Sequence, residues 1–195
     1  MQVRELAVQG ALEVTPRQFG DSRGLVLEWF RDDVFTRATG QRFDLQQANC
    51  SVSAAGALRG IHFADVPPGQ AKYVTCLSGS VMDVVVDLRV GSPTFGRWDS
   101  VLLDDVDRRA AYLPVGVGHA FLSLADGSTV AYLCSAPYTP EREHGVHPLD
   151  ADVGIRWPEV GRDGTPLTLE LSAKDQVAPT LQEALDSGLL PRWTG

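Results

Sequence analysis

The stretch Tyr73–Leu88, YVTCLSGSVMDVVVDL, carries the strongest indication of the fold. Two runs rich in β-branched residues, Tyr73–Leu77 and Val81–Leu88, flank the turn sequence Ser78-Gly79-Ser80. Runs of this kind, bounded by Gly and Ser, are typical of β-strands joined by a tight turn. The stretch therefore predicts a β-hairpin in the middle of the chain.

The same pattern of short strands and turns extends on both sides, from about Leu45 to Ser135. A second predicted hairpin turns at Ala125-Asp126-Gly127-Ser128. Short strands at this even spacing favour an antiparallel sandwich or barrel, and the jelly roll is a natural candidate. The further predicted strands are Trp98–Leu103, Ala111–Leu113, Ala120–Leu124 and Thr129–Ser135.

Helix is scarce in this prediction. Arg31–Thr39 is expected to form a short helix that ends at Gly40, and Thr180–Ser187 a second one. The second begins with Thr180 as N-cap and has Glu183 three residues later, the pattern of a capping box. The sequence thus predicts an all-β protein with a few short helices.

No internal repeat, low-complexity segment or linker interrupts the 195 residues. A chain of this length is sufficient for one well-buried core. We therefore expect one domain over residues 1–195, with a jelly-roll core at about 45–135 and a more irregular C-terminal part from about residue 140.

The charge balance limits the kinds of partner. The chain has 17 Lys and Arg against 25 Asp and Glu, and a formal net charge of −8. Nonspecific binding of nucleic acid needs a basic surface. No apolar segment is long enough to span a bilayer, and the N-terminus lacks the apolar region of a secretion signal. We expect neither nucleic acid nor a membrane as partner.

The three cysteines, Cys50, Cys76 and Cys134, are far apart and odd in number. Since no CxxC spacing is present, neither a zinc ribbon nor a redox pair is predicted. Their surroundings predict buried free thiols. Reduced thiols are typical of the cytoplasm, which is the expected location.

The chemistry is indicated by Leu58-Arg59-Gly60-Ile61-His62-Phe63, with Lys72 ten residues after the histidine. Histidine can accept a proton near neutral pH, and a lysine ammonium can stabilise the anion left behind. The pair indicates proton abstraction next to a carbonyl. A merely hydrogen-bonded histidine is the alternative, and the cations near His62 and a second histidine, His119, count against it.

Two histidines also raise the possibility of a metal site. Such a site in a small β-barrel needs at least three His, Glu or Asp ligands, often including a His-x-His pair. The positions of that pair are Gly60 and Ala64, and Asp65 is out of phase with the strand. Because Lys72 adds positive charge there, we predict no metal.

Two tyrosines have both a functional and a structural interpretation. Tyr132 is in phase with Val130 and Cys134 on an apolar strand face, so it is either a core tyrosine or a proton-donating phenol. Tyr138 lies between two prolines and is either a stacking surface for a base or a plain surface aromatic.

Arg23 and Arg59 have the same two interpretations, because an arginine beside a glycine turn can bind phosphate or remain a solvated charge. Asp175, in Leu171-Ser172-Ala173-Lys174-Asp175, can orient His62 only if the C-terminal part of the chain folds back over the barrel.

Taken together, these motifs resemble the dTDP-4-dehydrorhamnose 3,5-epimerase family, and especially its actinobacterial branch. The resemblance runs almost from end to end of the chain, with many blocks in the same order. The blocks are Phe19–Gly24, Gln47–Ser51, Arg59–Phe63, Gln70–Tyr73, Gly79–Asp87, Ser92–Gly96, Gly118–Phe121, Tyr132–Ser135, Leu171–Asp175 and Gly188–Trp193.

The resemblance implies a cupin-type double-stranded β-helix, or jelly roll, that needs no metal or other cofactor. It also implies a homodimer that exchanges N-terminal strands. On the matching positions, His62 is the general base, oriented by Asp175, Tyr132 is the acid on the opposite face, and Lys72 stabilises the enolate oxygen.

The resemblance further implies a substrate-binding set. Arginines would hold the diphosphate, amides and a glutamate would contact the nucleoside, Tyr138 would stack on thymine, and His119 would line the sugar site with support from Asp83. One departure from some relatives is a longer segment, Glu159–Leu169, before Asp175. The implied binding residues are Phe19, Arg23, Glu28, Gln47, Asn49, Arg59, Asp83, His119, Tyr138, Glu143 and Lys174.

The expected function is an epimerase that inverts C3 and C5 of dTDP-4-dehydro-6-deoxy-D-glucose to give dTDP-4-dehydro-L-rhamnose. The 4-keto group acidifies both C–H bonds, so inversion needs a base on one face and an acid on the other. A mono-epimerase acting at C3 only or C5 only, in antibiotic deoxysugar biosynthesis, has the same residues. A metal-dependent oxygenase and a non-catalytic sugar-nucleotide-binding barrel are the alternatives from other classes.

Overall fold

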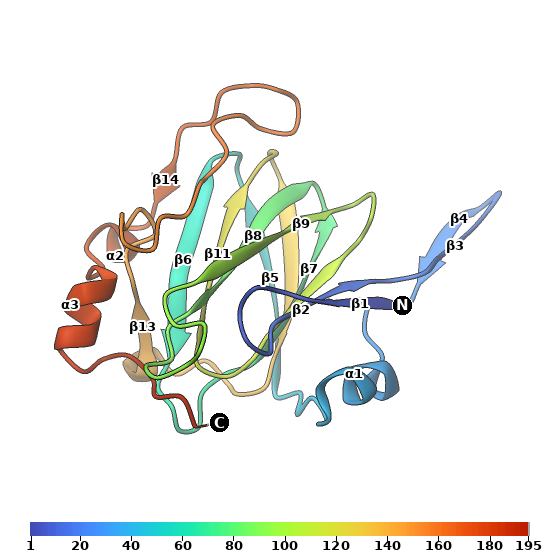
Figure 1. The fold of residues 1–195 in the computed structure, drawn as a ribbon. Coiled ribbons are helices and arrows are strands. Elements are labelled where there is room, and N and C mark those ends of the chain that lie inside the picture. Colours follow the sequence, from blue (N-terminus) through green and yellow to red (C-terminus); the bar gives the residue numbers. More distant parts are fainter. Residues whose placement is uncertain (195) are drawn as a thin grey trace.

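Two antiparallel β-sheets face each other in this computed structural model, which describes residues 1–194 (Figure 1). The first sheet has the order β1 (Gln2–Glu5), β2 (Leu12–Thr15), β10 (Ala110–Leu113), β7 (Lys72–Ser78), β12 (Ser128–Cys134) and β5 (Gln47–Ser53). The second has the order β13 (Glu143–Gly145), β6 (Ala57–Ala64), β11 (Val117–Ser123), β8 (Ser80–Asp87) and β9 (Trp98–Asp104), with β14 (Glu170–Leu171) beside β6. The predicted all-β jelly roll is confirmed.

Short helices complete the fold, and the two predicted from sequence are both present. The helix α1 (Asp32–Thr39) ends at Gly40, whose φ of 75° is a left-handed cap that glycine adopts without a steric penalty. The helix α3 (Leu181–Asp186) begins with the expected capping box between Thr180 and Glu183. The remaining helical segments are α2 (Ala173–Gln176) and the 3-10 turn Pro140–Arg142.

The two predicted hairpins are wrong, although their strands are correct. β7 pairs with β10 and β12, whereas β8 pairs with β9 and β11, so the turn at Gly79 carries the chain from one sheet to the other. β11 and β12 are likewise divided between the sheets. A turn sequence marks a reversal of the chain, but it does not determine whether the flanking strands pair or cross between layers. At this corner a Cβ on Gly79 would lie 2.8 Å from the Ser128 Cα, so only glycine fits.

Buried side chains on both faces of the second sheet explain why β8 reads as a continuous apolar run. Val81 and Val85 point into the core between the sheets. Val84 and Val86 point outward, where they pack against the C-terminal part of the chain, including Leu181 of α3. A strand covered on both faces shows no apolar–polar alternation.

The cysteine prediction is correct for Cys76 and Cys134, which are buried, and wrong for Cys50, which is exposed. Cys50 lies on β5, the last strand of its sheet, and its side chain points away from the core. All three thiols are free. None of the helices within residues 1–194 has the length and apolar character needed to cross a membrane.

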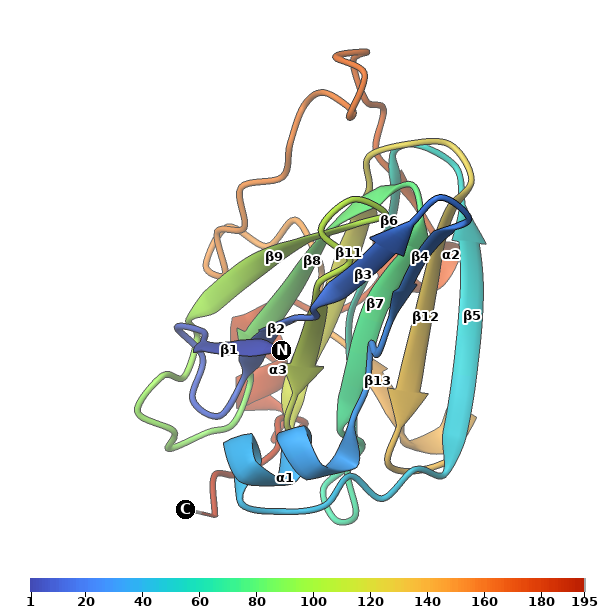
Figure 2. The same cartoon turned by 90° about the vertical axis from the view of Figure 1, so that its right-hand side faces the viewer.

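A two-stranded hairpin, β3 (Gln18–Asp21) and β4 (Gly24–Leu27), extends away from the two sheets (Figures 1 and 2). Among the described residues, these strands pair only with each other. The hairpin leaves Phe19 51% and Val26 71% exposed. Apart from the Arg17 guanidinium over the Phe19 ring, residues 1–194 leave most of this apolar surface uncovered.

Candidate active site

A cavity of about 500 Å³ lies between the two sheets, with walls from β5, β6, β7, β11, β12 and the C-terminal segment 170–175. A larger cleft, of about 830 Å³, lies under segment 161–170, but no histidine, lysine or tyrosine lines it. The chemistry-bearing side chains converge on the smaller cavity. Those that line it are Arg59, His62, Lys72, His119, Tyr132 and Asp175.

A bulge in β6 brings Arg59 and His62 to the same wall. Residues three apart in a regular strand point to opposite faces. Here the pairing with β11 shifts between His119, which is opposite His62, and Phe121, which is opposite Arg59. One extra residue in β6 therefore turns both side chains toward the cavity. Gly60 permits this, because a Cβ there would lie 2.5 Å from the His119 carbonyl oxygen.

The C-terminal part of the chain does fold back over the barrel, so Asp175 reaches His62. The His62 Nε2 and Asp175 Oδ1 are 2.6 Å apart, although 113 residues separate them. Burial by itself would raise the pKa of Asp175, but the hydrogen bond and charge of His62 hold that pKa below its ordinary value. The Ser172 hydroxyl, at the N-cap of α2, accepts from the Asp175 N–H and fixes its position.

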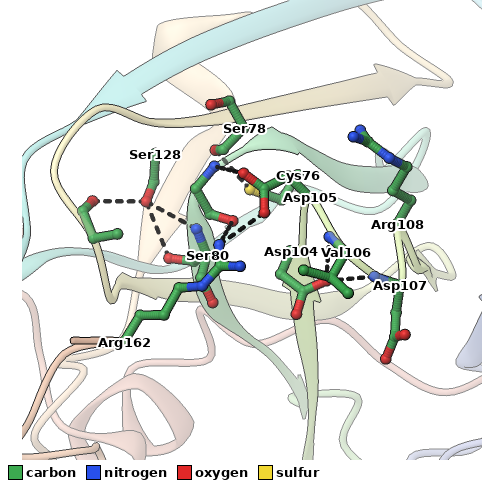
Figure 3. A network of polar contacts seen from close by, with 12 residues as sticks. Cys76, Ser78, Ser80, Asp104, Asp105, Val106, Asp107, Arg108, Ser128 and Arg162 are labelled. Carbon is green, nitrogen blue, oxygen red and sulfur yellow. Dashed lines mark hydrogen bonds and ion pairs between the residues drawn. The ribbon is translucent and has the colours of Figure 1, made fainter. Parts of the chain in front are cut away.

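Two sets of contacts fasten this C-terminal segment. β14 runs parallel to β6, and the Glu170 N–H donates to the Gly56 carbonyl oxygen at 2.9 Å. Further up the segment, the Arg162 guanidinium donates to Asp105 at 2.7 Å and to the Gly79 carbonyl at 3.2 Å (Figure 3). The ion pair is partly exposed, so the backbone contacts carry most of the attachment.

Tyr132 lies on the sheet opposite to His62. It belongs to β12 of the first sheet, while His62 belongs to β6 of the second, and both side chains line the cavity between them. Burial raises the pKa of Tyr132, and the Asn49 side chain, opposite it on β5, partly opposes this. The phenol is therefore protonated at neutral pH and can act as a proton donor.

Lys72 begins β7 and supplies the cation of the site. It lies opposite Cys134 on the neighbouring strand. Burial lowers the pKa of Lys72, while the negative charges of Glu143 and Asp83 oppose the shift. Lys72 is half-buried and lines the cavity, so its ammonium is screened less than a surface charge and interacts more strongly with an anion that enters there.

A second histidine–aspartate pair lies next to the first. The His119 Nε2 is 2.7 Å from Asp83 Oδ2, and both residues are buried. Asp83 is on β8, diagonally across from His119 on β11. The hydrogen bond holds the imidazole against the cavity wall.

The structure does not bring every predicted residue to the cavity of its own chain. Phe19, Arg23 and Glu28 lie on or beside the projecting β3–β4 hairpin, where Arg23 is paired with Asp21. Outside the cavity lining, but closer to it, are Gln47, Asn49, Tyr138, Glu143 and Lys174, of which Lys174 Nζ donates to the Glu143 carbonyl at 3.3 Å.

Sequence reasoning assigned no role to several residues that do line the cavity or support it. Ser53 accepts a hydrogen bond from Arg59 Nε at 3.1 Å, and Ser51 and Phe121 form part of the wall. The signal for the serines was the alternation of polar residues at 47, 49, 51 and 53, which marks one face of a strand. Phe121 and Ser172 carried no such signal.

No group of three or more His, Cys, Asp or Glu side chains within residues 1–194 is arranged to hold a metal ion. The two histidines of the cavity are instead each bonded to one carboxylate.

Comparison with known proteins agrees with this fold and cavity. The family model described as dTDP-4-dehydrorhamnose 3,5-epimerase matches residues 5–183. A dTDP-4-dehydrorhamnose 3,5-epimerase of Mycolicibacterium smegmatis is 61% identical, over 99% of this chain and 92% of the relative. The solved structure of the Mycobacterium tuberculosis rmlC epimerase matches with a TM-score of 0.93 and 57% identity, over 99% of this chain and 94% of that one.

A solved structure with a narrower activity matches as well. It is ChmJ, described as a 3'-monoepimerase from Streptomyces bikiniensis in complex with dTDP-quinovose, with a TM-score of 0.89 and 50% identity over 96% of this chain and 91% of that one. The fold and these matches define the class as cupin-type carbohydrate epimerases, which are isomerases. Within that class, the chain belongs to the dTDP-4-dehydrorhamnose 3,5-epimerase family.

Proposed function

We propose that the cavity epimerises C3 and C5 of dTDP-4-dehydro-6-deoxy-D-glucose and gives dTDP-4-dehydro-L-rhamnose. The observation that carries the proposal is the position of His62 and Tyr132 on opposite sheets of one cavity. A sugar ring between them has a base on one face and an acid on the other, which is what inversion requires.

In the first step, His62 removes the proton from C3. Its Nε2 bonds to the ionised Asp175, so Nε2 carries a proton and Nδ1 is left as the acceptor. The electron pair of the C3–H bond becomes part of an enolate, with negative charge on the oxygen of the 4-keto group. Lys72 stabilises this charge, a contribution on the order of 10²–10³ in rate for one such donor.

In the second step, Tyr132 donates its proton to C3 from the opposite face, and the configuration is inverted. The imidazolium of His62 then loses its proton to solvent, and the phenolate of Tyr132 regains one. The same pair acts on C5 when the ring presents that C–H bond to His62. Each inversion thus leaves one solvent-derived hydrogen on the product.

The remaining residues of the cavity support binding. Arg59, held by Ser53 at the edge of the cavity, is placed to neutralise a phosphate of the nucleotide. His119, bonded to Asp83, presents a fixed imidazole toward the sugar. The proposed ligand is therefore a dTDP-sugar, the class of ligand that solved structures of relatives contain.

The projecting hairpin supports a homodimer with a shared site. Phe19 and Val26 are exposed on it, and in the described part of the chain the strand β5 has a neighbour on one side only. A free strand edge and an uncovered apolar hairpin can satisfy each other in a second copy of the chain. We propose that Phe19, Arg23 and Glu28 reach the cavity of the partner. The free thiols agree with a cytoplasmic location.

Exchange in deuterated water tests the proposed reaction. The dTDP-4-keto-6-deoxy-glucose substrate is incubated with the enzyme, and the label is located by NMR. Label at both C3 and C5 is expected. Label at one carbon only would instead identify a mono-epimerase, and no label at all would overturn catalysis at this cavity.

Mixing two inactive variants tests the shared site. In a mixed dimer of Arg23→Ala and His62→Asn subunits, one of the two cavities has both residues intact if the hairpin crosses to the partner. Random assortment then restores about one quarter of wild-type activity. If each cavity is built from one chain, mixing restores nothing.

A further inference from the structure

Tyr138 presents an exposed ring from a segment that is neither helix nor strand. It is 57% exposed and lies between Pro137 and Pro140, in the irregular run that follows β12. An exposed aromatic ring can stack on a nucleotide base, but only if the ring is held at a fixed position and angle. An irregular segment does not supply this by itself, so the contacts that hold Tyr138 decide whether it can bind a base.

Two side-chain amides hold the peptide groups on either side of Pro137. Before the proline, Gln70 Nε2 donates to the Ala136 carbonyl oxygen at 2.8 Å. After it, the Tyr138 backbone N–H donates to Gln47 Oε1 at 2.9 Å. The pyrrolidine ring locks the φ torsion of Pro137, and the two held peptide groups then fix its ψ torsion as well. The backbone is therefore fixed up to the nitrogen of Tyr138.

Gln70 projects from a backbone that is itself held in place. Its neighbour Ala71 is buried and pairs with Ser135, the residue before Ala136. The Ala71 N–H donates to the Ser135 hydroxyl at 2.8 Å, and the Ala71 carbonyl accepts from the Ser135 N–H at 3.0 Å. The Gln70 amide is half-buried and does not line the catalytic cavity. Its position suits support of the segment that carries Tyr138, without contact to the reacting sugar.

We infer that Gln70 is a positioning residue that holds Tyr138 in the orientation in which its ring stacks on the base of the nucleotide. The inference rests on the proposed function, in which the ligand is a dTDP-sugar, and on the stacking of Tyr138 on thymine. A ring that is already in place spares the ligand the free energy of ordering the segment. Gln70 therefore contributes to the affinity for the nucleotide and not to the chemical step.

Gln70→Leu tests this role, because it removes the donor and leaves a side chain of similar size. The Kd for dTDP, measured by calorimetry, should rise about three- to tenfold, the loss expected for one hydrogen bond, and KM should rise with it. The exchange rate at saturating substrate should stay within about twofold of wild type. Gln182→Leu, which removes an amide bonded to Asp186 on the exposed face of α3, is the matched control and should change none of these values. A lower saturated rate with an unchanged KM would mean that Gln70 supports the nearby Lys72, and would overturn the inference.

A double-mutant cycle shows whether Gln70 acts through Tyr138. Tyr138→Ala removes the ring, and the Kd for dTDP should rise by about five- to 150-fold, the range for one base stacked on an aromatic side chain. If Gln70 positions that ring, Gln70→Leu adds no further loss of dTDP affinity in the Tyr138→Ala background. Losses that multiply would show that Gln70 acts on another part of the site, and would overturn the inference.

Pro137→Gly is a second test that does not depend on the folding of the Gln70 variant, because Pro137 is exposed. Glycine frees the φ torsion, so the Kd for dTDP should rise in the wild-type background and not in the Tyr138→Ala background. An unchanged Kd in Pro137→Gly would contradict the fixed segment.

Failure of the proposed function gives different results. Tyr138→Ala with the wild-type Kd for dTDP would refute the stacking on which the inference rests. Absence of deuterium label in the product of the wild-type enzyme would refute epimerisation. Losses that multiply in the double-mutant cycle, with labelling intact, would refute only the role of Gln70.

Discussion

The two histidine–aspartate pairs of this cavity have almost the same geometry and very different surroundings. His62 and His119 face each other on neighbouring strands, and their Nε2 atoms lie 2.6 and 2.7 Å from a carboxylate oxygen. The His62 side chain, however, is 36% exposed and the His119 side chain only 8%. The His62 imidazole can therefore exchange protons with solvent, whereas the His119 imidazole is largely shielded from it.

The carboxylates of the two pairs also come from different parts of the chain. Asp83 belongs to the strand next to His119, so this pair is part of the sheet and buried with it. Asp175 comes from α2 at the far end of the chain. One pair is therefore a structural unit buried in its sheet, and the other is assembled by tertiary folding around an imidazole that is open to the cavity.

Replacement of His62 should have the largest effect, and it tests directly whether the two pairs have different roles. His62→Asn removes the proposed base, and the rate of hydrogen exchange at C3 and C5 should fall by about 10²–10⁴. The Kd for dTDP and the thermal unfolding of the variant should stay close to wild type, because the side chain is partly exposed. His119→Asn should lose less rate. If it lost more, with dTDP binding intact, the two pairs would have the reverse roles.

Asp175→Asn should have the next largest effect on the rate. The amide is similar in shape but carries no charge, so it neither fixes the tautomer of His62 nor stabilises the imidazolium that forms. The exchange rate should fall by roughly 10², within the range of general acid–base contributions. Asp83→Asn is the matched change in the other pair and should cost less than this. Equal losses in both variants would mean that the carboxylates are equivalent.

Asp83→Ala tests the structural side of the comparison. It leaves the buried His119 N–H without an acceptor, so the free energy of unfolding should fall by about 1–3 kcal/mol. For a chain of this size that lowers Tm by about 2–4 °C per kcal/mol, measurable by calorimetry. Asp83→Asn retains an acceptor oxygen and should recover most of the loss. A stable Asp83→Ala protein would contradict a structural role for this pair.

The smallest expected effect is a dependence of stability on pH that belongs to Asp175. Its pKa in the folded protein is below the ordinary 3.8, so the ionised form stabilises the fold. That contribution is present above about pH 4 and is lost as the pH falls through the folded value. Urea unfolding of wild type and Asp175→Asn at pH 3 and pH 6 should show a larger acid loss in wild type. If the free energy of unfolding fell by the same amount in both proteins between pH 6 and pH 3, the dependence would not belong to Asp175.

Local signals in the sequence located most elements but did not pair them. The helix α1 with its Gly40 stop and the capping box of α3 depend on neighbours a few residues away, and both are found where predicted. The turn at Gly79 was also located, yet it joins strands of different sheets. Which strands pair is set by the burial of two sheet faces at once, which no local window contains.

The cavity shows the same division between sequence and structure. The residue types that can move protons and stabilise an enolate, His62, Tyr132 and Lys72, could be recognised from the sequence and its family resemblance. The bulge at Gly60, which turns Arg59 and His62 to one wall, was not expected, because regular alternation separates residues three apart.

By itself, the sequence determined the positions of the strands in the central part of the chain, the caps of the helices and the set of reactive side chains, because each depends on short-range preferences or on residue chemistry. The strands β1–β4, β13 and β14 were not located from the sequence. Only the tertiary structure decided which sheet each strand joins and that Asp175 lies against His62. It also decided that the β3–β4 hairpin points away from its own cavity. These features depend on contacts between distant parts of the chain, whose free energy is fixed only when the whole core is packed.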